Sequence, residues 1–136
     1  MIPEGAPFYS AETNGLVVRV VVSYVPQQSD PPSRFVWAYM VELENTSSST
    51  LQLVSRRWII TDAHGRVEEV EGPGVVGEQP VLAPGETYQY TSGCPLPTPS
   101  GSMVGTYRMA VEGGEAFEAA IPPFSLDLPG SRKTLN

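Results

Sequence analysis

Three glycines near the middle of the chain have the spacing of a phosphate-binding loop. The string G-x-G-x-x-G is formed by Gly72, Gly74 and Gly77. In dinucleotide-binding proteins this string leads from a strand into a helix, whose first backbone amides bind the pyrophosphate. Here Pro80 and Pro84 follow closely and prevent a helix of useful length. We therefore predict a glycine-rich turn, and nucleotide or pyrophosphate binding through residues 71–80 is the alternative.

Carboxylates around the same loop suggest a divalent cation as a second alternative. They belong to Asp62, Glu68, Glu69, Glu71 and Glu78. Hard cations such as magnesium bind carboxylate oxygens. However, Glu68 and Glu69 should point to opposite faces of a strand, and neither a calcium-loop spacing nor a histidine pair is present. We predict no metal ligands, and weak binding of magnesium or cobalt through residues 71–80 stays as an alternative.

Nucleophilic chemistry would have to use a single cysteine and a single histidine. Cys94 and His64 are the only residues of their types, and no local signature joins them to Asp62 as a catalytic set. We predict that Cys94 is a small, half-buried apolar residue. The sequence therefore predicts no catalytic residues, no cofactor-binding residues and no enzyme activity. A lone free thiol is typical of a reducing compartment, so we expect a cytoplasmic protein.

A second distinctive loop, SGCPLPTPSGSM, spans residues 92–103 and contains three alternating prolines. We expect these prolines to stiffen it into an extended, polyproline-like connection between strands of different sheets. A partner loses little ordering entropy when it docks on such a rigid edge. The candidate partner-binding residues from both loops are Gly72, Gly74, Gly77, Glu78, Gln79, Pro95, Pro97 and Pro99.

The elements that must position these loops are β-strands. Fourteen prolines and thirteen glycines punctuate the chain, and apolar residues alternate with a period of two in segments such as 16–25 and 35–45. Further strands are expected at 51–62, with a bend near 55–57, and at 66–70, 87–93, 101–112 and 115–121, with 124–128 as an extension. The pattern predicts an all-β fold, an immunoglobulin-like or fibronectin type III-like antiparallel sandwich of seven or eight strands. A small barrel is the alternative.

The chain reads as one domain over residues 16–128. We expect residues 1–15 to be a frayed N-terminal segment and residues 129–136 a C-terminal tail. No signal peptide and no apolar run near the roughly 18 residues of a membrane span are evident, so no membrane insertion is expected. The net charge of −7 repels phosphate backbones, which makes nucleic acid an unsuitable partner.

Several unusual strings, in order along the chain, resemble the ApaG family. They are WIITD at 58–62, GVVGEQP at 74–80, LAPGE at 82–86, YTSG at 90–93 and G-S-M-x-G-x-Y-x-M at 101–109. The resemblance covers residues 16–128. It implies an immunoglobulin-like sandwich in a small bacterial cytoplasmic protein of a family linked to cobalt resistance and magnesium efflux.

The resemblance also bears on function. Domains of this family occur attached to F-box proteins and to a polymerase-delta-interacting protein, where they resemble interaction modules. No catalytic residues carry over. The family's proposed phosphate-binding loop corresponds to Gly72, Gly74 and Gly77, where Pro73 removes one amide donor. We therefore predict a non-enzymatic binding module with an unidentified protein partner.

Overall fold

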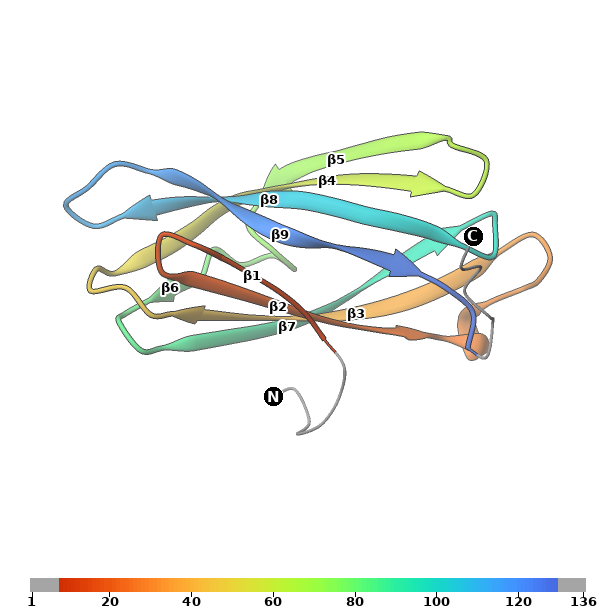
Figure 1. The fold of residues 1–136 in the computed structure, drawn as a ribbon, viewed down its shortest axis with the longest axis horizontal. Helices are drawn as coiled ribbons and strands as arrows, with labels where there is room; N and C mark the ends of the chain where they lie inside the picture. Colours follow the sequence, from red (N-terminus) through yellow and green to blue (C-terminus); the bar gives the residue numbers. More distant parts are fainter. Residues whose placement is uncertain (1–7, 130–136) are drawn as a thin grey trace.

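The computed structural model describes residues 8–129, which form a sandwich of two antiparallel sheets (Figure 1). The expected tail lies almost entirely outside the described residues. The elements are β1 (Tyr9–Thr13), β2 (Leu16–Tyr24), the 3-10 helix η1 (Pro26–Gln28), β3 (Phe35–Asn45), β4 (Leu51–Asp62), β5 (Val67–Pro73), β6 (Val81–Leu82), β7 (Thr87–Leu96), β8 (Gly101–Val111) and β9 (Phe117–Leu126). No helix within residues 8–129 is long and apolar enough to cross a membrane.

One sheet has the strand order β1-β2-β3-β7, and the other has the order β5-β4-β8-β9, with β6 paired to β4. Figure 1 shows the second sheet above the first, with their strands roughly aligned. The predicted all-β antiparallel sandwich is confirmed. The strand number is higher than predicted because β1 and the two-residue β6 were not foreseen.

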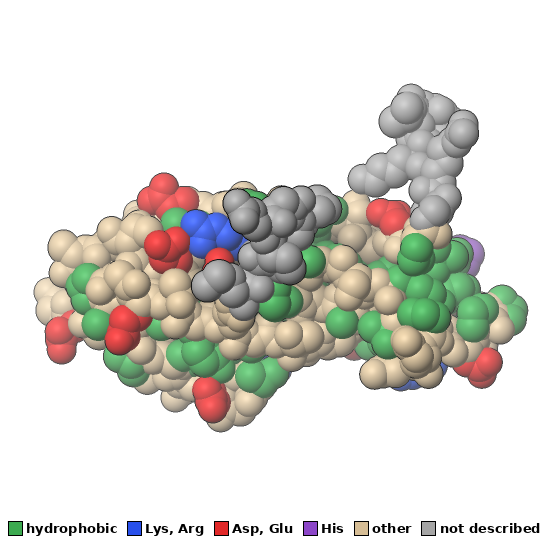
Figure 2. Space-filling model, turned by 90° about the horizontal axis from the view of Figure 1, so that it is seen from below, with side chains coloured by type: hydrophobic (Ala, Val, Ile, Leu, Met, Phe, Trp, Pro, Cys, Tyr) green, Lys and Arg blue, Asp and Glu red, His purple; other side chains and the backbone are tan. Residues whose placement is uncertain are grey.

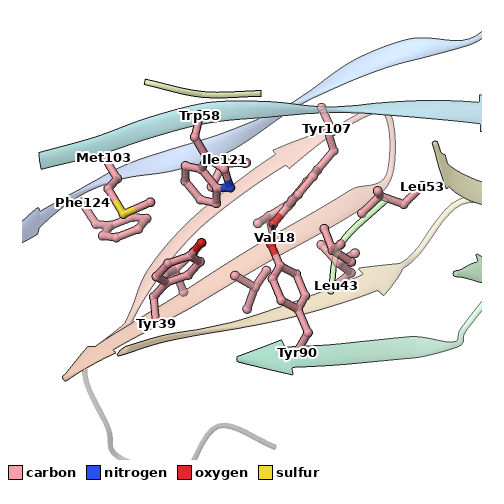
Figure 3. Packing of buried hydrophobic residues seen from close by; sticks show 14 of the residues in the cluster. Val18, Tyr39, Leu43, Leu53, Trp58, Tyr90, Met103, Tyr107, Ile121 and Phe124 are labelled. Carbon is pink, nitrogen blue, oxygen red and sulfur yellow. Dashed lines mark hydrogen bonds between the residues drawn. The ribbon is translucent and has the colours of Figure 1, made fainter. Parts of the chain in front are cut away.

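Period-two alternation explains why these segments are strands. In β3 the side chains of Trp37, Val41 and Leu43 are fully buried, while Ala38, Met40 and Glu42 on the other face are partly exposed. The strand therefore presents one face to the core and one to solvent. Figure 3 shows the core that results, in which Tyr90 from β7 reaches across the sandwich and its hydroxyl meets that of Tyr107 from β8.

Two strands are irregular where the apolar pattern changes. The register between β4 and β8 shifts between Leu53 and Ser55, close to the predicted bend. The register between β8 and β9 shifts between Met103 and Gly105, and residues 117–126 form one strand rather than a strand and an extension. Each shift is a local irregularity of the kind that bends and twists a strand.

The N-terminal segment is more ordered than predicted. Residues 9–13 form β1, which pairs with β2 through a turn at Asn14 and Gly15, so the expectation of fraying up to residue 15 is wrong for this part. The turn suits positive φ, which Gly15 adopts at 88° and Asn14 at 50°. Residues 1–7 lie outside the described residues.

The two long sides of the sandwich differ. On one side, here called the closed side, β1 contacts β9, and the Ala120 amide donates to Thr13 Oγ1 at 3.1 Å. On the other, here called the open side, β5 and β7 are the last strands of their sheets. Cavities lie between these two strands, and they are described below.

Candidate functional site

The glycine-rich loop is a tight reverse turn. The Val75 amide donates to the Glu78 carbonyl oxygen and the Glu78 amide donates to the Val75 carbonyl oxygen, both at 2.8 Å. The two central residues, Val76 and Gly77, have φ of 41° and 83°. Positive φ at both positions is the geometry of a type I′ hairpin turn. No helix begins at this loop, so the prediction of a turn in place of a helical phosphate site is confirmed.

The loop also uses its polar groups within the protein. The Gly74 amide donates to the Val54 carbonyl oxygen at 2.8 Å, and Gln79 Nε2 donates to the same oxygen at 2.8 Å. Gly74 has φ of 60°, and a Cβ there would overlap the Glu78 carbonyl oxygen. The turn therefore requires this glycine for its own geometry, and the Gly74 amide is not available to an anion.

The hollow beside the loop has little to hold an anion or a metal. It has a volume of about 260 Å³ and is lined by Pro73, Gly77, Glu78 and Gln79. Its one carboxylate, on Glu78, accepts a hydrogen bond from the Tyr88 hydroxyl at 2.9 Å. Within residues 8–129 no three His, Cys, Asp or Glu side chains gather as metal ligands.

Gly72 contributes in another way, because it makes room for an arginine. A Cβ on Gly72 would lie 3.0 Å from Arg56 Nη1. That nitrogen donates to the carbonyl oxygens of Pro73 at 3.1 Å and Gly74 at 3.0 Å. Two consecutive carbonyl groups at and just beyond the end of β5 therefore hold one nitrogen of the Arg56 guanidinium. Arg56 was not among the predicted site residues.

A groove with mixed chemistry lies between β5 and β7 and is here called the open-side groove. One part, of about 260 Å³, is lined among others by Tyr39, Arg56, Trp58, Glu68, Val70 and Met103. A second part, of about 320 Å³, is lined among others by Asp62, Val67, Leu96 and Pro97. The two parts share Ile60, Glu68 and Pro95, so they form one groove.

The floor of the groove is aromatic and rigid. Tyr39 and Trp58 are 5% and 3% exposed, and their rings meet edge to face with centroids 5.3 Å apart. Burial raises the pKa of the Tyr39 hydroxyl, which stays neutral at physiological pH. Phe124 packs beside both rings, with its centroid 5.9 Å from each (Figure 3). Because these rings are already fixed by packing, a ligand that touches their small exposed edges immobilises little further side-chain freedom.

Two charged side chains of the groove, Arg56 and Glu68, have no ion-pair partner in the part of the chain that the structure describes. Neither Arg56 nor Glu68 forms an ion pair within 4.0 Å with any residue of the described chain. Arg56 Nη2 and Nε have no acceptor among residues 8–129, and both atoms are reached by solvent, since no buried polar atom there lacks a partner. Arg57, next in the chain, instead pairs with Glu69 at 3.1 Å.

The outer face of the four-stranded sheet differs from the groove, because its arginine is paired with carboxylates. Figure 2 shows acidic side chains spread over this face with a basic group among them. There Arg19 pairs with Glu42 at 3.1 Å and with Glu44 at 2.9 Å. Arg56 in the groove therefore differs from Arg19 and Arg57, whose charges are neutralised by neighbouring carboxylates.

The candidate nucleophile is not activated. Burial, with a further contribution from the Glu68 carboxylate, raises the pKa of the Cys94 thiol to about 11, so the thiolate is scarce at neutral pH. Asp62 Oδ1 accepts hydrogen bonds from the backbone amides of His64 at 2.9 Å and Arg66 at 3.0 Å, which caps the turn. Cys94 lines the groove and His64 does not.

The proline-rich segment is partly a strand. Residues 92–96 belong to β7, with Pro95 opposite Val36, so the predicted polyproline-like path is wrong there. Only residues 97–100, which include Pro99, connect the two sheets. Pro95 and Pro97 border the groove, whereas Gly77, Glu78 and Gln79 line the separate hollow, so the two predicted loops do not form one site.

A family model described as the ApaG domain matches residues 26–111. The chain belongs to the ApaG family. It is 60% identical to protein ApaG from Beijerinckia indica over 129 residues, which cover 94% of this chain and 99% of the relative. Among solved structures, an ApaA protein from Bordetella pertussis is 52% identical, with a TM-score of 0.83 over 93% of this chain and 98% of that one.

The fold extends beyond the ApaG family. The C-terminal domain of Wzt shares 9% sequence identity with this chain, with a TM-score of 0.53 over 95% of this chain and 82% of that domain. At this identity the likeness concerns the sandwich alone.

Proposed function

We propose that this ApaG-family chain is a non-enzymatic binding module that holds an extended segment of a protein partner in the open-side groove. The observation that carries the proposal is the groove itself. Two sheet edges border an aromatic floor, and unpaired charges of both signs line the same hollow. Edge strands that remain open are templates for pairing with another chain, and pockets beside them provide specificity.

The backbone of β7 has groups free for such pairing. The neighbouring strand β3 shows which backbone groups point where. Asn45 exchanges hydrogen bonds with residues 85–86, on the β7 side of β3. The Val36 amide and carbonyl bond to Ser29 and Val25, on the opposite side. In an antiparallel pair the bonded positions alternate, so Thr91 and Gly93 of β7 direct their amides and carbonyls away from β3. Pro95 occupies the next outward position, where a missing amide costs the sheet nothing.

The sequence of β7 suits the approach of another backbone. Gly93 does not have positive φ, and a Cβ there would make only an ordinary contact, 3.5 Å from the Trp37 carbonyl oxygen. The fold therefore does not need glycine at this position. Glycine in a strand often marks a place where another chain comes close, and Gly93 borders the groove.

The alternatives have less support. The glycine-rich turn uses the Gly74 amide internally, and the described carboxylates do not gather around a common point. Phosphate and direct metal binding are therefore not part of the proposal. The cytoplasmic location and the link to cobalt resistance and magnesium efflux stay predictions from composition and resemblance.

Site-specific photo-crosslinking tests the proposal. A benzophenone amino acid would replace Thr91 at the edge of β7 or, as a control, Val104, which is exposed on β8. We expect one discrete crosslinked protein from cells of the source organism at position 91 and none at 104. Equal labelling at both positions, or none at either, would contradict a partner-binding role for this edge.

A proline substitution provides a second test with a matched control. Gly93→Pro removes an outward amide, as Pro95 already does, and should abolish crosslinking while the protein stays folded. Ser92→Pro removes an amide that pairs with β3 and should destabilise the fold. Crosslinking by Gly93→Pro at the wild-type level would show that the partner does not pair with β7.

A further inference from the structure

The inner face of β5, together with Arg56 of the neighbouring β4, presents three different groups in a row. Glu68, Val70 and Gly72 alternate with residues of the outer face, and the Arg56 guanidinium lies against Gly72. The row thus runs from an acidic group, through a half-buried apolar side chain, to a basic group. Glu68, Val70 and Arg56 all line the same cavity of about 260 Å³.

This row lies where an added strand would cover it. Because β5 is the last strand of its sheet and the cavity separates it from β7, a strand paired to β7 would extend the first sheet over β5. Alternate side chains of that strand would point into the groove about 6.7 Å apart. Three such side chains match the spacing of Glu68, Val70 and Gly72 along β5, where the Arg56 guanidinium of β4 lies against Gly72.

We infer that the groove selects an extended segment that carries a basic, an apolar and an acidic side chain at alternate positions. The acidic side chain pairs with Arg56, the apolar one covers Val70 and the basic one pairs with Glu68. This inference rests on the proposed function and specifies the chemistry of the partner.

Arg56 is prepared for a carboxylate. Its Nη1 is held by the carbonyl oxygens of Pro73 and Gly74, which fix the plane of the guanidinium. The other two nitrogens, Nη2 and Nε, are free of protein acceptors within residues 8–129 and form a fork that matches two carboxylate oxygens. Little side-chain entropy is left to lose when a carboxylate arrives.

The presence of Glu68 in the same groove favours a segment of mixed charge. A purely acidic segment would be repelled by Glu68 and by the net charge of −7, and a purely basic one would be repelled by Arg56. A segment with both charges, on opposite sides of an apolar residue, satisfies both groups. Repulsion between like charges also excludes segments in which the acidic and basic side chains stand in the opposite order.

The direction of the segment follows from the order of the groups. Glu68 borders the groove together with Pro95 and Leu96, so it lies at the C-terminal end of β7. Every strand pair in the two sheets is antiparallel, and a segment paired in the same manner runs from this end toward Tyr88. It therefore meets Glu68 first, and its order from the N-terminus is basic, apolar, acidic.

Two synthetic peptides of identical composition test this order. The first is acetyl-Thr-Lys-Thr-Val-Thr-Glu-Thr-amide, and the second exchanges its lysine and glutamate. Each is titrated into the isotope-labelled full chain while the amide signals of Thr91 and Gly93 are followed. We expect the first peptide to bind about tenfold more tightly, as for two partly buried charge-assisted contacts. Equal affinity, or tighter binding of the second peptide, would overturn the inference.

Charge variants assign the contacts. Arg56→Gln should reduce the preference for the first peptide, and Arg57→Gln, on the same strand but paired to Glu69, should leave it unchanged. Glu68→Gln should reduce it in the same way as Arg56→Gln. A preference that survives in both groove variants would overturn the inference, provided that circular dichroism shows each variant to be folded.

Failure of the inference and failure of the proposed function give different results. If crosslinking at position 91 captures a partner but the two peptides do not differ, the groove binds a segment of other chemistry and only the inference fails. If N-acetyl-glutamate amide alone binds as tightly as the first peptide, backbone pairing contributes nothing and the inference fails as well. If neither crosslinking nor peptide binding occurs, both fail.

Discussion

Edge strands border both the closed and the open side of the sandwich, but they pack together only on the closed side. On the closed side β1 covers β9, Tyr9 packs on Phe124 with ring centroids 5.9 Å apart, and a side chain of β1 accepts the Ala120 amide. On the open side β5 and β7 stand apart, with half-buried apolar groups and unpaired charges between them. The closed side completes the core, whereas the open side leaves space that another strand could fill.

This difference shows where folding free energy and binding free energy reside. Burial of apolar area stabilises the fold only where the area is removed from water, as around Ile121, which is 1% exposed. Area that stays accessible contributes little to folding and is available for a partner. A module of this kind is stabilised by one side and binds through the other.

Truncation of apolar side chains should separate the two sides most clearly. Ile121→Ala, in β9, should lower the free energy of unfolding by about 3 kcal/mol, because it leaves a cavity in a fully packed region. Val70→Ala, in β5, should cost less than about 1 kcal/mol, because the side chain is already partly exposed to water. Urea denaturation measures both, and equal losses would show that the open side is as much a part of the core as the closed side.

Added methyl groups give the next largest effect. A Cβ at Gly105, in the middle of β8, would overlap the Arg57 carbonyl oxygen, so Gly105→Ala should cost about 2 kcal/mol. Gly93→Ala, at the open edge of β7, should change stability by less than about 0.5 kcal/mol, because the space beside it is ordinary. Thermal unfolding of the two variants checks this, and a large loss for Gly93→Ala would mean that this edge is packed.

Much of this comparison was predictable from the sequence, and its limits are physical. Alternating apolar residues locate β2, β3 and β4 because a strand that is half buried must repeat every two residues. Pro80 and Pro84 predict correctly that no helix follows the glycines. The exposed β1, with only two of five residues half-buried, carries no such pattern, so its order depends on tertiary contacts with β2 and β9.

The site was harder to predict than the fold. Pro95 and Pro97 were identified as partner-binding candidates and do border the groove, although for a different local structure. Arg56 was missed, yet a signal was present, since an arginine at an inward position interrupts the apolar alternation of β4. Arg56 has no ion-pair partner within residues 8–129 because Glu69 and Glu71 face Arg57 on the outer surface. Only the strand register reveals this arrangement.

The tyrosine pair tests how firmly the open edge is attached to the rest of the molecule. The hydroxyls of Tyr90, on β7, and Tyr107, on β8, are hydrogen-bonded in the core. Tyr107→Phe leaves the Tyr90 hydroxyl buried without this partner and should cost about 1.5 kcal/mol. Hydrogen exchange should then accelerate in β7 more than in β1, and uniform acceleration would contradict a local role. The double Phe variant should cost less than the sum of the single variants.

The Cys94 thiol reports whether the floor of the groove excludes water. Burial, with a further contribution from the Glu68 carboxylate, raises its pKa from 9.0 to about 11 in the folded chain. A raised pKa stabilises the fold fully below pH 9.0, and this contribution is lost as the pH rises toward 11. Relative to Cys94→Ala, the wild type should therefore lose about 1 kcal/mol by pH 9.5, measured by urea denaturation at each pH. If the difference in unfolding free energy between wild type and Cys94→Ala stays constant from pH 7 to 10, water solvates the thiolate. The floor of the groove would then be accessible to solvent.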